Sequence, residues 1–179
     1  MCNNLELKTK NNNLYLPQKA KITKILEFTE QENFFELEII SGQPLGHNPG
    51  QFVQISLLGI GEAPISVSSP PSQNNKFEIC VRAVGDVTNK LHTLNIGDEI
   101  FFRGPFGHGF EPDILKKMQG KHLLFFAGGI GYVPLRSLIN KVIAEKENYQ
   151  KISILYGCKT PKERMYPDEL TQIAKIGDN

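Results

Sequence analysis

The pattern of hydrophobic positions changes its period near Gly120, which divides the chain into two parts. Before this point, short stretches alternate apolar and polar residues. In 51–58, for example, Val53, Ile55 and Leu57 occupy every second position. A period of two is typical of a strand with one buried face. We predict such strands, separated by turn residues, at 20–29, 34–41, 51–58, 65–69, 77–84 and 99–103.

These six short strands predict an all-β domain over residues 17–119. A closed six-stranded antiparallel barrel is the expected arrangement, because closure leaves no strand edge exposed. The turn at Gly85-Asp86 leads into one short helix, predicted at 87–94. Residues 1–16 are polar and rich in asparagine, and we expect them to form a disordered tail.

After Gly120 the pattern becomes that of a βαβ unit. Residues 123–127 form an unbroken apolar run, as in a strand that is covered on both faces. A glycine-rich turn follows, and Pro134 suits the first turn of a helix that continues to about Ala144. Residues 152–156 predict a second buried strand, followed by a loop and the start of another helix. We therefore expect residues 120–179 to form part of an α/β nucleotide-binding domain.

Charge and composition exclude several kinds of partner. Lysine and arginine number 20 against 19 acidic residues, so no basic excess exists to bind nucleic acid or an anionic membrane. The apolar runs are too short to span a bilayer and no secretory leader is evident, so we expect a cytoplasmic protein without membrane insertion. Cys2, Cys80 and Cys158 are widely spaced, as are the four histidines. We expect no metal site and no iron–sulfur ligands, and a buried core position for Cys80.

The turn after 123–127 contains Gly128, Gly129 and Gly131, followed by Pro134, between a predicted strand and a predicted helix. Glycines let the backbone approach a pyrophosphate, and the helix N-terminus offers free N–H groups. The alternative is a tight strand-to-helix turn without a ligand. The spacing G-x-G-x-x-P departs from the dehydrogenase fingerprint, and no acidic residue ends the second strand, so a standard NAD-dependent dehydrogenase fits poorly.

Three further segments, each ordinary when taken alone, occur in an informative order: 62–69, 81–91 and 104–107. Together with the glycine turn, they resemble the ferredoxin–NADP reductase superfamily. Residues 63–69 fall on the family's flavin strand, R-x-Y-S-x-x-S, and residues 85–88 on the glycine and hydroxyl residue of its flavin-phosphate segment. Residues 104–107 match its G-P-x-G, and residues 127–134 contain its G-G-x-G-x-x-P.

The resemblance covers nearly all of 17–170. It is nearest to the gamma subunits of sulfhydrogenases, the related subunits of anaerobic sulfite reductases and the electron-transfer subunits of dihydroorotate dehydrogenases. The Ala-Pro-Ile-Ser form of the flavin strand indicates this branch. The resemblance implies a flavoprotein oxidoreductase subunit that moves electrons between NAD(P)H and a partner redox subunit or iron–sulfur protein through bound FAD.

The resemblance also assigns roles to residues. It places the hydroxyl of Ser66, the catalytic candidate, near N5 of the flavin, where a hydroxyl would orient the ring. Gly128, Gly129, Gly131 and Pro134 would hold the nicotinamide nucleotide. The contacts to FAD that it implies are Ala63, Pro64, Ile65, Ser66, Val81, Arg82, Gly85, Asp86, Val87, Thr88 and Gly104.

Several features depart from the family pattern. Ala63 and Ile65 stand where the family has arginine and tyrosine, and Arg82 is a candidate to replace the missing charge. A nucleotide domain of this class has about five parallel strands, whereas two are predicted. The family's C-terminal C-G-P motif and its clustered cysteines are absent. We expect an incomplete nucleotide domain, either in a fragment or in a chain that another subunit completes.

Two functions therefore stay open on the sequence alone. One is the electron-transfer subunit, and the other is a non-catalytic flavin barrel that only docks on a partner. The choice between NADH and NADPH also stays open, although Lys159 and Arg164 are candidates to meet a 2′-phosphate. FAD rather than FMN follows from the resemblance alone.

Overall fold

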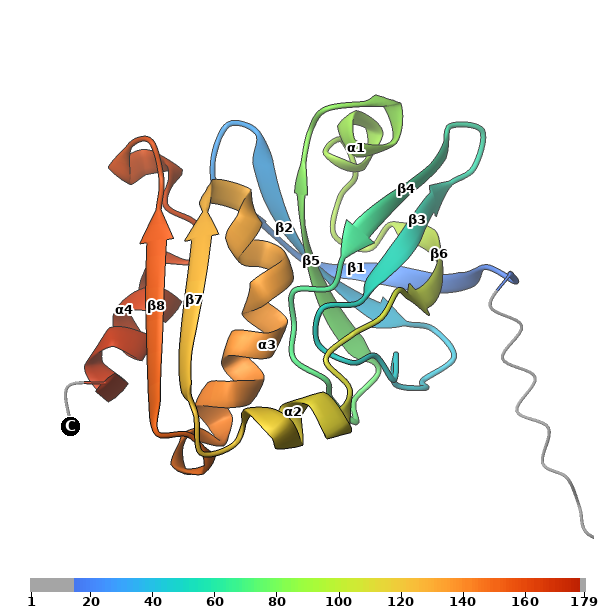
Figure 1. Ribbon diagram of the computed structural model, residues 1–179. Helices are drawn as coiled ribbons and strands as arrows, with labels where there is room; N and C mark the ends of the chain where they lie inside the picture. Colours follow the sequence, from blue (N-terminus) through green and yellow to red (C-terminus); the bar gives the residue numbers. More distant parts are fainter. Residues whose placement is uncertain (1–14, 178–179) are drawn as a thin grey trace, which may run out of the picture.

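The computed structural model describes residues 15–177, so residues 1–14 of the expected tail lie outside it. The first part is a six-stranded antiparallel sheet in the order β4-β3-β6-β1-β2-β5, and the second contains a parallel pair, β7-β8 (Figure 1). The strands of the first sheet are β1 (Gln18–Glu27), β2 (Glu32–Ile39), β3 (Phe52–Leu57), β4 (Gly61–Ser66), β5 (Lys76–Arg82) and β6 (Glu99–Phe106).

The six-stranded sheet curls so that its two outer strands, β4 and β5, approach each other. An isolated bridge joins Val67 to Ile79, and the N–H of Ser68 donates to the carbonyl of Glu78 at 2.8 Å. Away from this bridge the two strands diverge, and the short helix α1 (Asp86–Leu91) lies against β4. The predicted six-stranded barrel is thus confirmed, and it is closed at one end and opened by α1 at the other.

The barrel core follows the period-two pattern of the sequence. Val53, Ile55 and Leu57 point inward, together with Phe77 and Ile79 of β5, and all belong to one buried cluster. The alternate residues of β5 face the second part of the molecule instead. Cys80 lies on that face, buried as predicted, with its Sγ 4.0 Å from Sδ of Met165.

Some predicted boundaries were wrong. The strand expected at 65–69 begins at Gly61, because residues 61–66 pair along the whole of β3. Pro64 lies inside this strand, which proline tolerates because β4 is at the edge of the sheet. β6 runs to Phe106, beyond the end of the strand predicted at 99–103. Helix α2 (Pro112–Met118) was not predicted, because it is short and has no fully buried residue, although Leu115 and Met118 pack partly against the second buried cluster.

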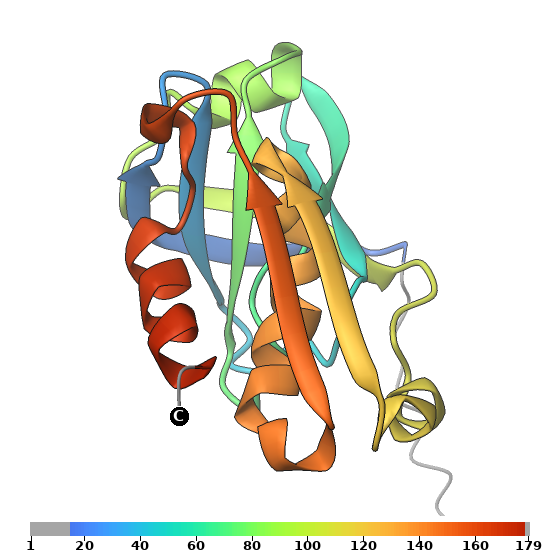
Figure 2. The same ribbon diagram turned by 60° about the vertical axis from the view of Figure 1, so that its left-hand side comes forward.

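The second part is built from β7 (His122–Gly128), α3 (Tyr132–Ala144), β8 (Lys151–Gly157) and α4 (Pro167–Gly177). Both helices pack on the side of the strands that faces the barrel, in a second buried cluster. No helix covers the other face within the described residues (Figure 2). Leu124, Phe126 and Leu155 are there 54%, 65% and 54% exposed, so only one face of each strand is covered. Among the described residues no helix is long and apolar enough to cross a membrane.

Candidate functional site

The predicted flavin strand overlaps β4, and α1 lies against this strand. Ile65 of β4 and Val87 of α1 both pack against the barrel core. Because side chains alternate along a strand, Pro64 and Ser66 point away from the core that Ile65 contacts. The hydroxyl of Ser66 has no hydrogen-bond partner among residues 15–177, so it is available to a ligand. Ala63 pairs with Ile55 and is half-buried.

The turn from β5 into α1 is stabilised by Thr88. Its hydroxyl accepts hydrogen bonds from the N–H groups of Val84 and Gly85, at 3.0 and 2.9 Å, and donates to the carbonyl of Gly85 at 3.0 Å. The side chain of Thr88 is therefore buried in shaping the turn. Val81 is also buried, in the barrel core, so it can offer a cofactor only backbone groups. Asp86 is exposed at the first position of α1.

Arg82 occupies the end of β5, on the face opposite to Val81. It forms an ion pair with the buried carboxylate of Glu32 on the neighbouring strand β2. From the sequence, Arg82 was a candidate to replace the family's phosphate-binding arginine. In the structure its guanidinium instead has a partner within the barrel.

Gly104 is required by the barrel itself. Its φ is +135°, and an added Cβ would lie 3.2 Å from Cγ1 of Val53 and 3.3 Å from the carbonyl oxygen of Phe52. Phe52 pairs with both Ser66 on β4 and Phe106 on β6. Gly104 thus lets β6 approach the start of β3, beside the strand that carries Ser66.

The glycine turn lies at the carboxyl end of β7, on the same end of the molecule as α1 (Figures 1 and 2). Gly129 to Gly131 form a short 3-10 turn that leads directly into α3, and Pro134 is the third residue of that helix, as predicted. A pocket here is lined by the last residues of the two parallel strands, Phe126 to Gly128 and Leu155 to Gly157. Ligands of open α/β sheets bind outside the carboxyl ends of their strands.

The glycines of both turns leave room for a ligand. No atom lies within 4 Å of a Cβ built on Gly85, Gly128 or Gly131, and none of the three has a positive φ. The protein's own packing and backbone therefore give no reason for glycine at these positions. A phosphate that approaches the main chain closely does give one, so the residues present fit the diphosphates of the predicted cofactors.

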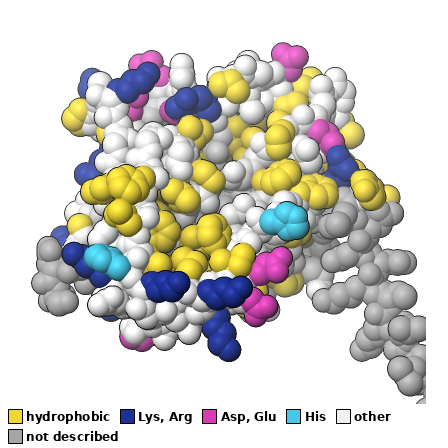
Figure 3. All heavy atoms as spheres, in the orientation of Figure 1, with side chains coloured by type: hydrophobic (Ala, Val, Ile, Leu, Met, Phe, Trp, Pro, Cys, Tyr) yellow, Lys and Arg dark blue, Asp and Glu magenta, His cyan; other side chains and the backbone are white. Residues whose placement is uncertain are grey.

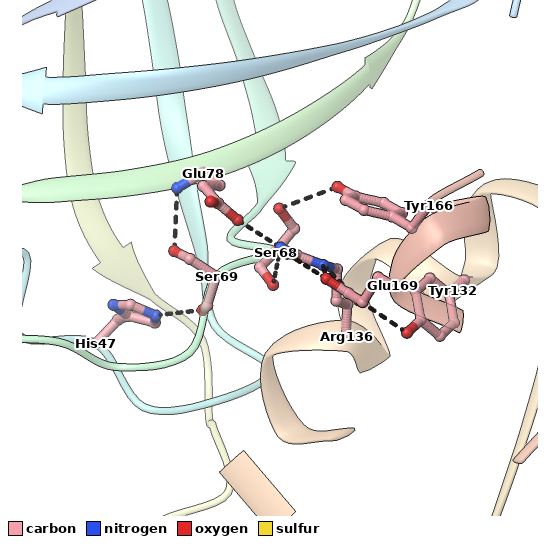
Figure 4. Close-up of polar contacts among 8 residues, drawn as sticks. All are labelled: His47, Ser68, Ser69, Glu78, Tyr132, Arg136, Tyr166 and Glu169. Atoms are coloured by element: carbon pink, nitrogen blue, oxygen red, sulfur yellow. Dashed lines mark hydrogen bonds and ion pairs between the residues drawn. The ribbon is translucent and has the colours of Figure 1, made fainter. Parts of the chain in front are cut away.

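Sequence reasoning missed one buried polar cluster, which joins the two parts of the molecule (Figure 4). At its centre is Arg136 of α3, which is 8% exposed and donates to Glu78 of the barrel, to the carbonyl of Ser68 and to Glu169 of α4. One sequence signal could have revealed this cluster: Arg136 lies on the apolar stripe of the predicted helix, four residues after Tyr132.

The charges of this cluster are balanced locally. Burial opposes the charged form of Arg136, but its hydrogen bonds with Glu169 and the charge of Glu78 raise the pKa of the guanidinium. Burial raises the pKa of the phenols of Tyr132 and Tyr166, which flank the guanidinium and stay neutral. At the edge of the cluster, burial lowers the pKa of His47, whose Nε2 donates to the carbonyl of Ser69 at 3.0 Å.

Two family models match the chain in the order of its two parts. The oxidoreductase FAD-binding domain matches residues 19–110, and the oxidoreductase NAD-binding domain matches residues 125–179.

Similar curated proteins are subunits of larger enzymes. The gamma subunit of sulfhydrogenase 2 from Pyrococcus furiosus is 36% identical over 169 residues, which are 93% of this chain and 57% of that protein. The probable electron-transfer subunit of dihydroorotate dehydrogenase B from the same organism is 34% identical over 128 residues, 72% of this chain and 45% of its own length. The chain thus spans about half the length of these relatives.

Solved structures share the fold. The flavohaem-like FAD/NAD-binding domain of nitric oxide dioxygenase from Vibrio cholerae superposes with a TM-score of 0.76 at 19% identity, over 89% of this chain and 70% of that one. Ferredoxin–NADP+ reductase from Plasmodium falciparum gives 0.73 at 22% identity, over 89% and 66%. The chain therefore belongs to the oxidoreductase FAD-binding domain family, within the ferredoxin–NADP reductase superfamily, with FAD and a nicotinamide nucleotide as its cofactors.

Proposed function

We propose that the chain is an electron-transfer oxidoreductase subunit, which takes electrons from NAD(P)H and delivers them through FAD to a partner redox protein. The observation that carries this proposal is the pair of open glycine turns, at Gly85 and at Gly128 to Gly131, on the same end of the molecule. One turn belongs to the barrel and the other to the α/β part, so a flavin and a nicotinamide held there would meet between them.

The barrel residues that would hold FAD fall into two groups. The backbone N–H groups of Asp86 and Val87, at the open turn of Gly85 that Thr88 shapes, would bind the diphosphate. Ala63, Pro64 and Ile65, with the main chain of Val81, would border the ring system, and Arg82 and Gly104 would support the strands around them. Bound FAD accepts a hydride and releases single electrons. The free hydroxyl of Ser66 would hydrogen-bond to the ring where the hydride arrives.

The α/β residues that would hold the nicotinamide nucleotide are Gly128, Gly129 and Gly131. Their open backbone, and the N-terminus of the 13-residue helix α3, suit a pyrophosphate. Pro134 has no N–H to lose in the first turn of this helix and fixes its start.

The partner is proposed to be a redox subunit or an iron–sulfur protein. This rests on the relatives, which are a sulfhydrogenase gamma subunit and a probable electron-transfer subunit of dihydroorotate dehydrogenase B. A second candidate function is a flavin barrel that docks on a partner without reacting with NAD(P)H. The uncovered face of β7 and β8, with Leu124 and Phe126 exposed, favours it, because a complete parallel sheet is covered on both faces.

The test compares variants of the FAD-loaded chain under anaerobic conditions. Replacing the free hydroxyl in Ser66→Ala should slow flavin reduction by NADH or NADPH about 10-fold to 100-fold, in the range of a lost positioning or proton-transfer contact. Gly131→Val fills the open turn and should abolish reduction by the nucleotide while dithionite still bleaches the flavin.

Ser41→Ala is the matched control, since Ser41 is exposed in a distant turn. If Ser66→Ala and Gly131→Val both behave like Ser41→Ala, neither residue has the proposed role. If FAD binds but neither nucleotide reduces the wild-type chain, the docking barrel is the correct function.

A further inference from the structure

We infer that Arg136 is a positioning residue, which fixes the flavin strand of the barrel relative to the glycine turn of the α/β part. This inference deepens the proposed function and rests on it. Arg136 is not among the residues proposed to hold either cofactor. It instead joins three segments that are far apart in the sequence, its own helix α3 and two that its guanidinium binds, and each contact is buried or half-buried.

The first segment is α3 itself. This helix begins at Tyr132, directly after Gly131, so any movement of the glycine turn along the sheet moves α3 with it. Arg136 lies one turn into the helix. Its side chain leaves α3 toward the barrel (Figure 4).

The second segment is the continuation of the flavin strand. The carbonyl of Ser68, two residues after Ser66, accepts a hydrogen bond from Nη1 of Arg136 at 3.2 Å. The same nitrogen binds the carboxylate of Glu78 on β5. The N–H of Glu78 donates to Oγ of Ser69 at 3.0 Å, and the N–H of Ser68 donates to the carbonyl of Glu78. Arg136 therefore binds both segments that meet where the barrel closes, through Ser68 on one side and Glu78 on the other.

The third segment holds the guanidinium in its orientation. Glu169 of α4 accepts from Nε at 2.9 Å and from Nη2 at 2.6 Å, a two-pronged contact that only a planar guanidinium can make. The ring of Tyr166 covers the guanidinium carbon at 4.3 Å, and its hydroxyl lies 3.4 Å from Oγ of Ser68. Tyr166 has a φ of +50°, an uncommon backbone conformation that the surrounding contacts maintain.

These contacts set the position of Ser66 relative to the glycine turn. Ser66 belongs to β4, and the glycine turn belongs to the α/β part. Arg136 is the charged link from the first helix after that turn to the segment that follows Ser66. A hydride transfer needs its two reacting groups placed to a fraction of an ångström, and an error of about 1 Å can cost about 100-fold in rate.

Two measurements on the full FAD-loaded chain test the inference. The variants are Arg136→Met, Arg136→Lys and the control Lys141→Met, which removes a cation of the same helix that pairs with Glu145. Rapid mixing with NADH, anaerobically, should show that Arg136→Met lowers the limiting rate of flavin reduction at least about 10-fold while the dissociation constant of NADH changes less than about 3-fold. Arg136→Lys should recover only part of the rate, because an ammonium cannot reproduce the fork.

Amide hydrogen exchange is the second measurement, and it does not depend on nucleotide reduction. In Arg136→Met the amides of 65–69 should exchange faster by at least about 10-fold relative to those of β2, the internal reference for global stability. Lys141→Met should leave this ratio unchanged. Equal acceleration of 65–69 and β2, or an unchanged ratio in Arg136→Met, overturns the inference. If NADH fails to reduce even the wild-type flavin, the proposed function fails, and the exchange ratio alone decides the role of Arg136.

Discussion

Residues of the same type in this chain differ in chemistry because their burial differs. Cys80 of β5 is buried against Met165, and Cys158 is exposed directly after β8. Burial raises the pKa of Cys80 to about 12, so its thiolate is almost absent at neutral pH. The thiolate is the reactive form of cysteine. Position in the fold, rather than residue type, therefore sets which thiol reacts.

This difference predicts selective alkylation. In a Cys2→Ser background, iodoacetamide should modify Cys158 under native conditions and modify Cys80 only when the chain unfolds. Mass spectrometry of the intact protein, with and without urea, measures the two events. A Cys2→Ser, Cys158→Ser variant is the control and should stay unmodified when folded. Rapid native labelling of that variant would show that Cys80 is not protected as described.

His47 makes stability depend on pH. Burial lowers its pKa from the ordinary 6.5, so below that pH the unfolded chain binds a proton more readily than the folded chain. The contribution of His47 to the free energy of unfolding is therefore fully present above about pH 6.5. It declines as the pH falls toward the pKa of His47 in the folded state, by at most about 1.4 kcal/mol per pH unit.

His47→Gln tests this effect, because an amide N–H can still donate to the carbonyl of Ser69 but does not titrate. The free energy of unfolding, measured with urea between about pH 5 and 8, should fall toward low pH more steeply in the wild type than in the variant. A difference between the two proteins that is the same at every pH would contradict the assignment.

Strands with a one-sided hydrophobic pattern were predictable from the sequence. Features that depend on contacts between residues distant in sequence were not. The strands around Val53 and Phe77 follow directly from a period of two. The start of β4 was missed because Gly61 and Glu62 carry no apolar signal, and their pairing with β3 is what makes them a strand. Arg136 was missed for a similar reason, since its partners Glu78 and Glu169 are distant in sequence and meet only in the fold.

In the candidate site, too, local sequence patterns were predictable and the partners of individual side chains were not. The glycine turn and the Ser66 strand were recognisable because their residue order is local. The internal role of the Thr88 hydroxyl and the Glu32 partner of Arg82 depend on geometry that the sequence does not encode locally.

The junction of β3 and β6 requires a glycine at position 104. Gly104→Ala places a Cβ against Val53 and Phe52 at a φ of +135°, so it should destabilise the barrel by about 1–3 kcal/mol. Gly97→Ala is the control: its φ is also positive, at +102°, but a Cβ there meets nothing within 4 Å. Urea unfolding should show a larger loss for Gly104→Ala. Equal losses would mean that packing between β3 and β6 adds nothing to backbone strain.

At the scale of the whole molecule, one surface is unusually apolar. Apolar side chains gather over β7, β8 and α3 on the visible face in Figure 3. The uncovered side of β7 and β8 adds Leu124, Phe126 and Leu155. Large exposed apolar patches bind partners or promote association.

This surface predicts dye binding and self-association by the 179-residue chain. The fluorescence of the dye ANS should rise on addition of the folded protein, and Phe126→Glu should remove much of the rise. Ile96→Glu is the control, because Ile96 is also exposed but lies on the barrel, away from these strands. Equal fluorescence from wild type and Phe126→Glu would show that the uncovered face is not the dye site.

We propose that electrons pass from a nicotinamide nucleotide to FAD between the two parts of the chain. An anaerobic titration of the FAD-loaded wild-type chain with NADH and, separately, NADPH measures this transfer directly. We predict that at least one nucleotide bleaches the visible absorbance of the flavin, and that ferricyanide then restores it. An unchanged flavin spectrum with both nucleotides, while dithionite bleaches the same sample fully, would contradict the account.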